Sequence, residues 1–506
     1  MDKVYDYIDR NKWIEWILFL GVFWLFIVNL HLNRGLDDMI PGYHYWRKTD
    51  TYAQIMNYYH NGLNFFDHGI YYNQMKSQGQ AVAEFPLYYY FVAVQLKFFG
   101  QHDIILKINW LVTLFFGMWS IFKISLYFTK NHLLSIAVPL TLFLSPVFAI
   151  YCIEYLPDPI ALNLSFIGLY FLLKYDTRQT KKSLILGLLF ISISGMMKPF
   201  YLIPFIALVI IIIGGKLLKK EAILKYWFYS IPFILVGLWF LYVEWYNSSV
   251  NSAYFLSSTK SVWALKPEIL VKTNEKIMTK WWPAYFHPIY FLVFIGMAFT
   301  ALTLYFRSNL KQISFYIFCL LGSAVFIILF YGMLKDHDYY IFPILFLIPL
   351  TAGLTAYNIS KIKWPSIVNT SIGFLVLVFM YSNVTYSWEI RQSRLKYKPV
   401  NATHLFVKYK GLDHFLLDNG IGPDDLVIAF SDKSPSYALL LLNRKGWSGY
   451  QTFSRRLHVN DLIDRGAKYI VIDNEILQKR DSVALEGVEM TYLADTNQIY
   501  LYKLDQ

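Results

Sequence analysis

The amino-acid sequence predicts a polytopic α-helical membrane protein that carries a small α/β domain at its C-terminal end. Three observations predict this fold class. Of the 506 residues, 56% are hydrophobic and 19% aromatic, whereas a soluble domain is roughly 45–50% apolar. The apolar residues form runs of about twenty, the length that crosses a bilayer as a helix. From about residue 395 the pattern changes to short β-rich runs that alternate with a helical one.

The apolar runs predict about eleven spanning helices. One further run, 86–100, is short for a span and contains tyrosines and Lys97, so we expect an interfacial or re-entrant helix there. The eleven spans are predicted near residues 13–32, 104–128, 133–152, 159–174, 183–197, 199–215, 226–246, 286–306, 313–333, 339–358 and 366–387.

Basic residues predict how these helices are oriented. The net charge of +12 is concentrated in short loops between the apolar runs, and strict alternation of the spans places these loops on one side. By the positive-inside rule that side is cytoplasmic. The N-terminus is then cytoplasmic and the C-terminal domain extracytoplasmic, and membrane lipids rather than nucleic acid are the expected surroundings of the charge. The basic loops are 1–12, 129–132, 174–182, 216–225, 307–311 and 360–364.

The same pattern predicts two domains. We expect a transmembrane module over residues 1–392, with extracytoplasmic loops 33–103 and 247–285, and a soluble extracytoplasmic domain over 393–506. In this last domain, residues 424–430, 467–473 and 498–504 predict strands, and residues 434–446 predict a helix. Cys152 and Cys319 both lie in apolar runs and form neither a disulfide framework nor a zinc pattern.

Three acids fall on the predicted outer face: Asp50, Glu84 and Asp158, the last between Pro157 and Pro159. Each has a structural alternative. Asp50 and Asp158 each have the sequence context of a helix N-cap, and Glu84 that of a carboxylate at a helix N-terminus. Both interpretations stay open for each acid, but three such coincidences on one face favour a functional site.

Basic and aromatic residues join the acids on this face. Arg47 lies in the first loop, and Lys198 at the outer end of a span, where snorkelling to the interface is the alternative. The stretch "KDHDYY" could also be a solvated loop, although its double tyrosine enters a span; it contributes Lys335, His337, Tyr339 and Tyr340.

Sugar transfer from a lipid-linked phosphate to a hydroxyl needs this set of residues. One carboxylate serves as the general base for the hydroxyl, and cations hold the charge of the departing phosphate. A nucleotide cofactor is not expected, because neither a Walker nor a dinucleotide motif occurs. Two other classes stay open. A glycan polymerase or ligase would share the lipid-linked donor, and a transporter would place polar residues near the bilayer midplane.

The sequence resembles the GT-C glycosyltransferases of the protein O-mannosyltransferase and lipid A aminoarabinose transferase group. The resemblance implies an inverting hexosyl- or pentosyltransferase that uses a polyprenyl-phosphate sugar on the periplasmic side of the bacterial inner (plasma) membrane. It implies a glycan, lipid or protein acceptor. It does not imply a metal ion or another cofactor, although a divalent ion stays an alternative if Asp50, Glu84, Asp158 and His337 converge. It rests on "TDTYAQIMNYYHNG" (49–62), "EFPLYYYFVAVQLKFFG" (84–100), "YLPDPIALNLSFIGLYFLLKY" (155–175), "MMKPF" (196–200) and "HDYYIFPILFLIP" (337–349).

The resemblance also assigns roles. It implies that Asp50 is the base or a sugar ligand, that Glu84 belongs to a Glu-x-Pro element, and that Asp158 is the acid before a proline. It places Lys198 near the donor phosphate. Two departures stand out: Thr49-Asp50 replaces an Asp-Glu pair, and Glu84-Phe85-Pro86 replaces Glu-Lys-Pro. The positive charge that balances the phosphate is therefore expected to come from Arg47, Lys198 or Lys335. His337, Tyr339 and Tyr340 are the expected substrate contacts.

Overall fold

The structure is a computed structural model. It describes residues 12–34, 42–73, 77–255, 259–305, 310–362, 365–396, 400–450, 457–475 and 484–505. The basic segment 1–12, except for its last residue, lies outside the described residues, as do parts of the basic loops 307–311 and 360–364 and of the loop 33–103.

The chain forms two compact units, each made of three segments. The first unit contains Met1–Leu36, Lys107–Trp239 and Ser258–Ser393. The second contains Asp37–Leu106, Phe240–Ser257 and Arg394–Gln506. Helices α5, α11 and α18 belong partly to each unit, because the boundaries fall inside them.

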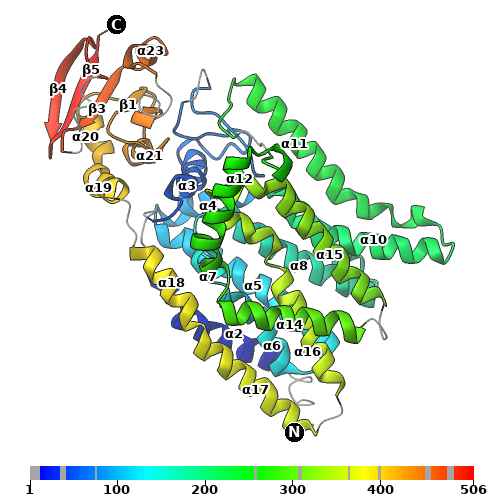
Figure 1. Ribbon diagram of the computed structural model, residues 1–506. Coiled ribbons are helices and arrows are strands. Elements are labelled where there is room, and N and C mark those ends of the chain that lie inside the picture. The colour runs from blue at the N-terminus through cyan, green and yellow to red at the C-terminus, as the bar shows by residue number, and fades with distance from the viewer. Residues whose placement is uncertain are drawn as a thin grey trace. The chain divides into compact units, whose positions relative to one another are not determined.

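The first unit is helical, with short 3-10 turns. Of these, η2 (Pro199–Leu202) contains Tyr201, and η7 (Asp338–Ile344) contains Tyr339 and Tyr340. Its helices, shown in Figure 1, are α2 (Lys12–Asn29), α5 (Asp103–Thr129), α6 (His132–Leu140), α7 (Pro146–Tyr151), α8 (Pro157–Arg178), α9 (Lys181–Met197), α10 (Ile203–Leu218), α11 (Ile231–Ser249), α12 (Pro267–Lys276), α13 (Trp282–Tyr285), α14 (Pro288–Tyr305), α15 (Leu310–Phe330), α16 (Leu347–Lys361), α17 (Ser366–Asn383) and α18 (Thr385–Lys396).

These helices confirm the predicted polytopic α-helical membrane protein. Among the described residues, seven helices are long and apolar enough to cross a membrane, and an eighth if a pair bent by 82° at residues 285–288 is counted as one span. Each of the eleven predicted ranges contains helix, but the helices over 133–152, 159–174 and 183–197 are shorter or more polar. The seven are Lys12–Asn29, Asp103–Thr129, Pro199–Leu218, Ile223–Ser249, Leu310–Met333, Asp338–Lys361 and Thr370–Arg394.

The pair α8 and α9 lies in the interior of the first unit. The N-terminal half of α8 is buried from Pro157 to Gly168. A Cβ on Gly168 would come within 2.7 Å of Ile191 Cγ1, and one on Gly187 within 2.7 Å of Leu172 Cδ2. Small residues at such contacts let helix backbones approach closely in a membrane. This packing holds the first turn of α8 in a fixed position.

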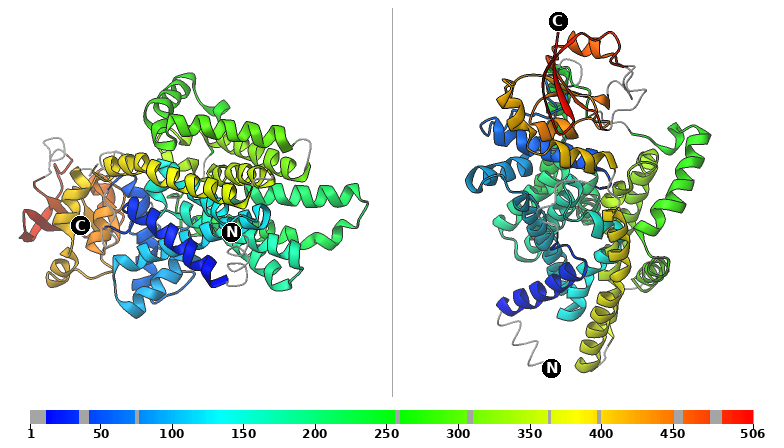
Figure 2. Two further views of the ribbon diagram at one scale, coloured as in Figure 1. Left: turned by 90° about the horizontal axis from the view of Figure 1, so that it is seen from below. Right: turned by 90° about the vertical axis from the view of Figure 1, so that its left-hand side faces the viewer.

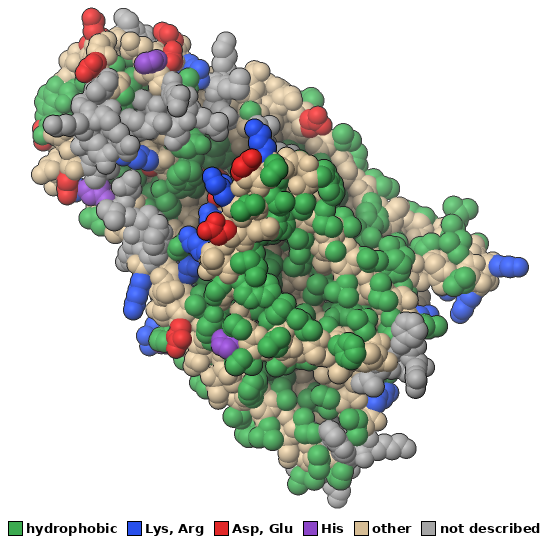
Figure 3. Space-filling view, viewed as in Figure 1, with side chains coloured by type: hydrophobic (Ala, Val, Ile, Leu, Met, Phe, Trp, Pro, Cys, Tyr) green, Lys and Arg blue, Asp and Glu red, His purple; other side chains and the backbone are tan. Residues whose placement is uncertain are grey.

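The outer faces of the spanning helices are apolar. Leu292 and Phe299 of α14, and Leu321 and Val325 of α15, are all at least half exposed. In Figure 3, hydrophobic side chains cover the visible surface over α14 and α15, and charged side chains are sparse there. A surface of this kind is stable in contact with lipid chains.

The second unit contains the first loop and the C-terminal tail. A five-stranded sheet has the order β2-β1-β3-β5-β4, with β1 parallel to β2 and β3, and β5 antiparallel to β3 and β4. In Figures 1 and 2 the hairpin of β4 and β5 forms one edge of the sheet. The strands are β1 (Val427–Ala429), β2 (Gly446–Ser448), β3 (Tyr469–Asp473), β4 (Met490–Thr496) and β5 (Ile499–Leu504); the helices are α3 (Tyr45–His60), α4 (Leu87–Phe99), α19 (Val400–Tyr409), α20 (Leu412–Asp418), α21 (Tyr437–Leu442) and α23 (Val459–Ile463).

The predicted α/β tail is confirmed, and β1, β3, β5 and α21 fall on the predicted runs. The first loop is bonded to this tail within the second unit. Asn73 donates a backbone hydrogen bond to Gly446 at 2.6 Å, and Gly446 donates one to Tyr71 at 3.0 Å. Helix α4 covers the run 86–100; its residues Tyr89, Val92 and Leu96 are buried, while Phe98 and Phe99 are exposed.

Candidate active site

Asp50 lies in the second unit, on the second turn of α3. It is only 7% exposed. The Tyr254 hydroxyl donates a hydrogen bond of 2.6 Å to Asp50 Oδ1, and Arg47 Nη1 lies 3.9 Å from Oδ2. The alternative that Asp50 caps the helix is wrong, because α3 begins at Tyr45 and its N-cap is His44.

The environment of Asp50 changes its acidity. Burial raises the pKa of this carboxyl group to about 7, and the neighbouring Glu84 acts in the same direction. Arg47 and the hydrogen bond from Tyr254 lower the pKa but do not cancel the effect of burial. A carboxyl group with this pKa exchanges its proton near neutral pH, as a general base must.

Arg47 links Asp50 to the second acid of the loop. Arg47 Nη2 donates a hydrogen bond to Glu84 Oε1, and its guanidinium carbon lies 5.9 Å from the centroid of the Phe255 ring. Glu84 precedes Pro86, the N-cap of α4, by two residues. Its other oxygen, Oε2, is buried and has no hydrogen-bond partner among the described residues. In the part of the chain that the structure describes, one cation therefore holds two buried carboxylates.

Asp158 forms a second cluster, in the first unit. It is 2% exposed and lies in the first turn of α8. Lys198 Nζ donates to Asp158 Oδ2 at 2.7 Å, and the Tyr201 hydroxyl donates to Oδ1 at 2.8 Å. The N-cap of α8 is Leu156, so the capping alternative for Asp158 is wrong. Lys198 is the C-cap of α9, and its ammonium group is bound to the carboxylate of Asp158. This ion pair explains the position of the side chain better than snorkelling to the interface does.

The aromatic residues of "KDHDYY" surround this ion pair. Lys198 Nζ lies 5.8 Å from the Tyr339 ring centroid and 5.6 Å from that of Tyr340. The His337 ring lies 5.5 Å from each of these two rings. Asp338, fully buried, accepts a hydrogen bond of 2.9 Å from the Tyr151 hydroxyl. The structure thus brings together four predicted site residues of the first unit with Asp158.

Lys335 is not held in this cluster by any contact that the described residues show. Its carbonyl oxygen accepts a hydrogen bond of 3.3 Å from Trp281 Nε1, and its side chain is half-buried.

Two residues that the sequence did not single out belong to these clusters, Tyr254 and Tyr201, and a separate ion pair of the first unit joins Lys107 and Glu154. Lys107 Nζ forms a buried ion pair of 3.5 Å with Glu154. Glu154 stands in the same "EYLPDP" stretch as Asp158, so its position in the sequence was a usable signal. Tyr254 and Tyr201 are two of 41 tyrosines, and only the fold distinguishes them.

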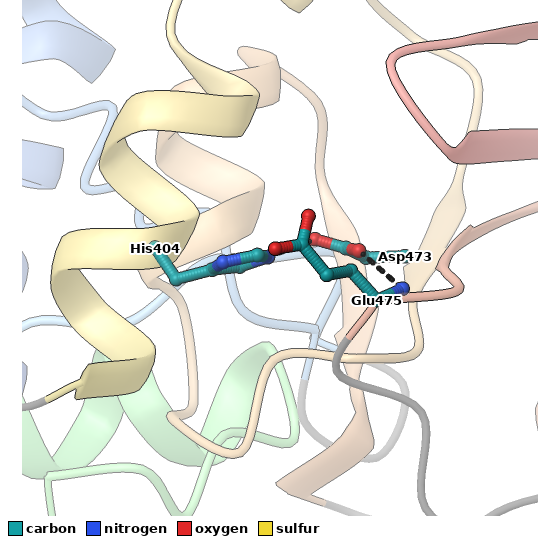
Figure 4. Close-up of side chains that lie close together, drawn as sticks. All are labelled: His404, Asp473 and Glu475. Atoms are coloured by element: carbon teal, nitrogen blue, oxygen red, sulfur yellow. Dashed lines mark hydrogen bonds and ion pairs between the residues drawn. The ribbon is translucent and has the colours of Figure 1, made fainter.

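One group of residues in the described part of the chain has the side chains of a metal site. His404 of α19, Asp473 at the end of β3 and Glu475 in the next turn bring three ligand atoms within 4.8 Å of one another, as Figure 4 shows. These atoms already have protein partners. His404 Nε2 lies 2.6 Å from Asp473 Oδ2, and Lys408 Nζ pairs with Glu475 Oε2 at 2.6 Å. An ion here would have to displace Lys408.

The fold agrees with the one that the resemblance to the GT-C glycosyltransferases predicts. Two solved structures have this fold over nearly the whole chain. They are ArnT from Cupriavidus metallidurans bound to undecaprenyl phosphate (TM-score 0.58, 10% identity, 97% of this chain and 98% of that chain) and ArnT from the same organism in the apo state (TM-score 0.59, 10% identity, 98% of each chain).

Archaeal oligosaccharyltransferase AglB from Archaeoglobus fulgidus, in complex with an inhibitory peptide and a dolichol-phosphate, matches with a TM-score of 0.49 and 10% identity over 96% of this chain and 74% of that chain. No family model matches the sequence, and no curated protein matches it. At 10% identity the likeness to ArnT establishes the fold.

Proposed function

We propose that the protein is an integral membrane glycosyltransferase. It transfers a hexosyl or pentosyl group from a polyprenyl-phosphate donor to an acceptor hydroxyl, with inversion at the anomeric carbon. The observation that carries this proposal is the buried carboxyl group of Asp50, whose pKa is about 7 and which lies beside Arg47. The fold supports it, since ArnT has been solved with undecaprenyl phosphate bound.

In the proposed reaction Asp50 accepts the proton of the acceptor hydroxyl. The hydroxyl oxygen forms a bond to the anomeric carbon from the side opposite the phosphate, and the bond from that carbon to the phosphate oxygen breaks. The phosphate leaves with the electron pair and needs no proton, so a cation suffices to stabilise it. Deprotonation by Asp50 is a general-base step of the kind that contributes roughly 10²–10⁴-fold to a rate.

Lys198 of the first unit is proposed to hold the charge of the phosphate, with Arg47 and Lys335 as the alternatives. Asp158 and Tyr201 position Lys198 from one side, and the Tyr339 and Tyr340 rings lie beside its ammonium group. We assign Asp158 as a positioning residue and Lys198 as the phosphate ligand. His337 and the two tyrosines are proposed substrate contacts.

The proposed location is the bacterial inner membrane, with the N-terminus cytoplasmic and the clusters on the extracytoplasmic side. The basis is the charge of the loops between spans. The acceptor is a glycan, a lipid or a protein. A glycan polymerase or ligase would use the same donor and base, and the identity of the acceptor distinguishes it. No cofactor is proposed.

The test is transfer in proteoliposomes from radiolabelled polyprenyl-phosphate sugars, with the wild type beside Asp50→Asn. Asp103→Asn is the matched control, because Asp103 also accepts a hydrogen bond from a tyrosine, Tyr52, in the second unit. We expect the wild type and Asp103→Asn to transfer sugar, and Asp50→Asn to bind donor without transfer. Transfer by Asp50→Asn at the wild-type rate would contradict the assignment of the base.

A further inference from the structure

The first unit contains a cavity that the proposed reaction does not use. Helices α5, α8, α10, α15 and α16 line a partly open cavity of about 580 Å³. This volume is within the range of roughly 300–1,000 Å³ that is typical of ligand pockets. Most of its wall is aliphatic or aromatic; Phe166, Leu172, Ile211, Phe315 and Leu354 are examples. The wall therefore suits an alkyl chain.

The cavity lies toward the opposite end of α8 from the cluster of Asp158 and Lys198. Along α8 its lining begins at Phe166 and ends at Asp176. Asp176 is about 27 Å further along the helix axis than Asp158, at roughly 1.5 Å per residue. This separation is close to the thickness of a bilayer core, about 30 Å. A ligand in the cavity would therefore have its polar end near the other membrane surface.

Positive charge gathers at that end. Lys216 and Lys219 at the end of α10, and Lys311 at the start of α15, line the cavity together with a single acid, Asp176. α10 and α15 lie side by side (Figure 1), so the lysines of both helices reach the same opening. Lys216 is paired with Glu221 at 2.8 Å. Neither Lys219 nor Lys311 forms an ion pair with a described residue.

An apolar cavity with cations at its opening matches an amphipathic anion. Basic pockets between spanning helices bind anionic lipid headgroups in this way. We propose that this cavity binds an anionic phospholipid, with its phosphate between Lys219 and Lys311 and an acyl chain in the cavity. A zwitterionic headgroup would bring its own cation to the lysines and bind less well.

The cavity can be filled without touching the lysines. Gly215 lines it, and a Cβ built on Gly215 meets no atom within 4 Å. Gly214, the preceding residue, also has nothing within 4 Å but does not line the cavity. Gly215→Leu and Gly214→Leu therefore make a matched pair: both replace a glycine in the same turn of α10 with a helix-favouring side chain, and only the first enters the cavity.

The experiment is native mass spectrometry of the full-length protein titrated with phosphatidylglycerol or phosphatidylcholine. We expect the wild type to bind phosphatidylglycerol at least tenfold more tightly than phosphatidylcholine. The variant Lys219→Gln/Lys311→Gln should lose this preference, at roughly fivefold per lysine. Lys266→Gln/Lys272→Gln, which changes two exposed lysines that do not line the cavity, should keep it.

The two glycine variants decide the proposal if the lysine variant does not fold. Gly215→Leu should lower phosphatidylglycerol binding at least fivefold, and Gly214→Leu should leave it unchanged. Equal binding of the two lipids by the wild type would overturn the proposal, as would equal behaviour of the two glycine variants. Displacement of phosphatidylglycerol by undecaprenyl phosphate would also overturn it, because the cavity would then belong to the donor. Sugar transfer is not the readout, so failure of the proposed function leaves this test intact.

Discussion

At the scale of single residues, Asp50 and Asp158 are both buried carboxylates, but their neighbours differ. Among the described residues, Asp50 accepts a hydrogen bond from Tyr254 and lies 3.9 Å from a guanidinium nitrogen of Arg47, which also bonds to Glu84. Asp158 is held between two donors at hydrogen-bonding distance. The first arrangement leaves a carboxyl group that can take up a proton, and the second fixes the position of a lysine.

The pH dependence of transfer tests the task of Asp50. Only its ionised form accepts a proton, so kcat/KM should rise about tenfold per pH unit below pH 7 and level off above it. Asp50→Asn should remove this rise of kcat/KM with pH and lower kcat/KM by at least about 10²-fold. Initial rates from pH 5.5 to 8.5 provide the measurement. If kcat/KM of Asp50→Asn still rises with pH as in the wild type, the group that titrates is not Asp50.

The stability of the protein should respond to the same carboxyl group with a defined sign. The pKa of Asp50 is about 7 in the folded protein and about 4 in an unfolded chain. Asp50 therefore destabilises the fold increasingly as the pH rises between these two values, because the folded state resists ionisation. The Tm of Asp50→Asn relative to the wild type should increase from pH 4.5 to pH 8. A Tm difference that is constant with pH would contradict burial as the cause of the raised pKa.

The pair of Lys198 and Asp158 can be tested by a double-mutant cycle. Lys198→Met leaves a buried carboxylate without its cation, and breaking such a pair costs about 3–5 kcal/mol. Adding Asp158→Asn removes the unpaired charge, so the double variant should be more stable than Lys198→Met alone. Lys198→Met and the double variant should both raise KM for the donor, because both lack the proposed phosphate ligand. Additive losses of unfolding free energy would show that the two side chains do not interact.

Single residues also show where sequence reasoning ends. Asp50, Glu84, Asp158 and Lys198 are predicted because charged side chains beside apolar runs converge on one predicted face. Tyr254 lies 204 residues from Asp50. A tyrosine in an aromatic-rich chain has no unusual local pattern, so its contact with Asp50 appears only once the loop is folded against α3.

At the scale of elements, the close packing of α8 and α9 determines where Asp158 and Lys198 meet. A larger side chain at Gly168 would collide with Ile191, including its backbone nitrogen at 3.0 Å, which cannot rotate away. Gly168→Leu should therefore destabilise the protein by roughly 1–3 kcal/mol, the usual cost of overpacking. Gly296→Leu on α14, where a Cβ meets nothing within 4 Å, is the control. Thermal unfolding in detergent compares them, and equal Tm values would contradict tight packing at this contact.

Elements differ in how well the sequence predicts them. The spanning helices are predicted because lipid requires long apolar runs. Strands β1 and β3 are predicted because they are buried and rich in valine and isoleucine. Strand β2 has three residues and begins at a glycine, and β4 is an edge strand whose residues are mostly exposed. Both lack the local apolar pattern and form because neighbouring strands supply hydrogen bonds.

At the scale of the whole molecule, the first loop and the C-terminal tail belong to one compact unit. Hydropathy cannot reveal this, because the bonds of Gly446 to Tyr71 and Asn73 join residues that are hundreds of positions apart. A chain ending at Ser393 should therefore lose the partners of its first loop. Limited proteolysis should cut residues 42–106 at least several-fold faster in this truncated chain than in the full one. Equal protection of the loop in both chains would show that it folds without the tail.

The division of the second unit into three segments has a consequence for how the protein is made. The 287 residues from Lys107 to Ser393 separate the first segment from the last. At roughly 5–20 residues per second, their synthesis takes about 15–60 s. During that time the first loop has already left the ribosome, but strand β2, whose Gly446 bonds to Tyr71 and Asn73 of this loop, does not yet exist. The unit that contains the candidate base is therefore completed only with the last segment of the nascent chain, after most of the spanning helices have been synthesised.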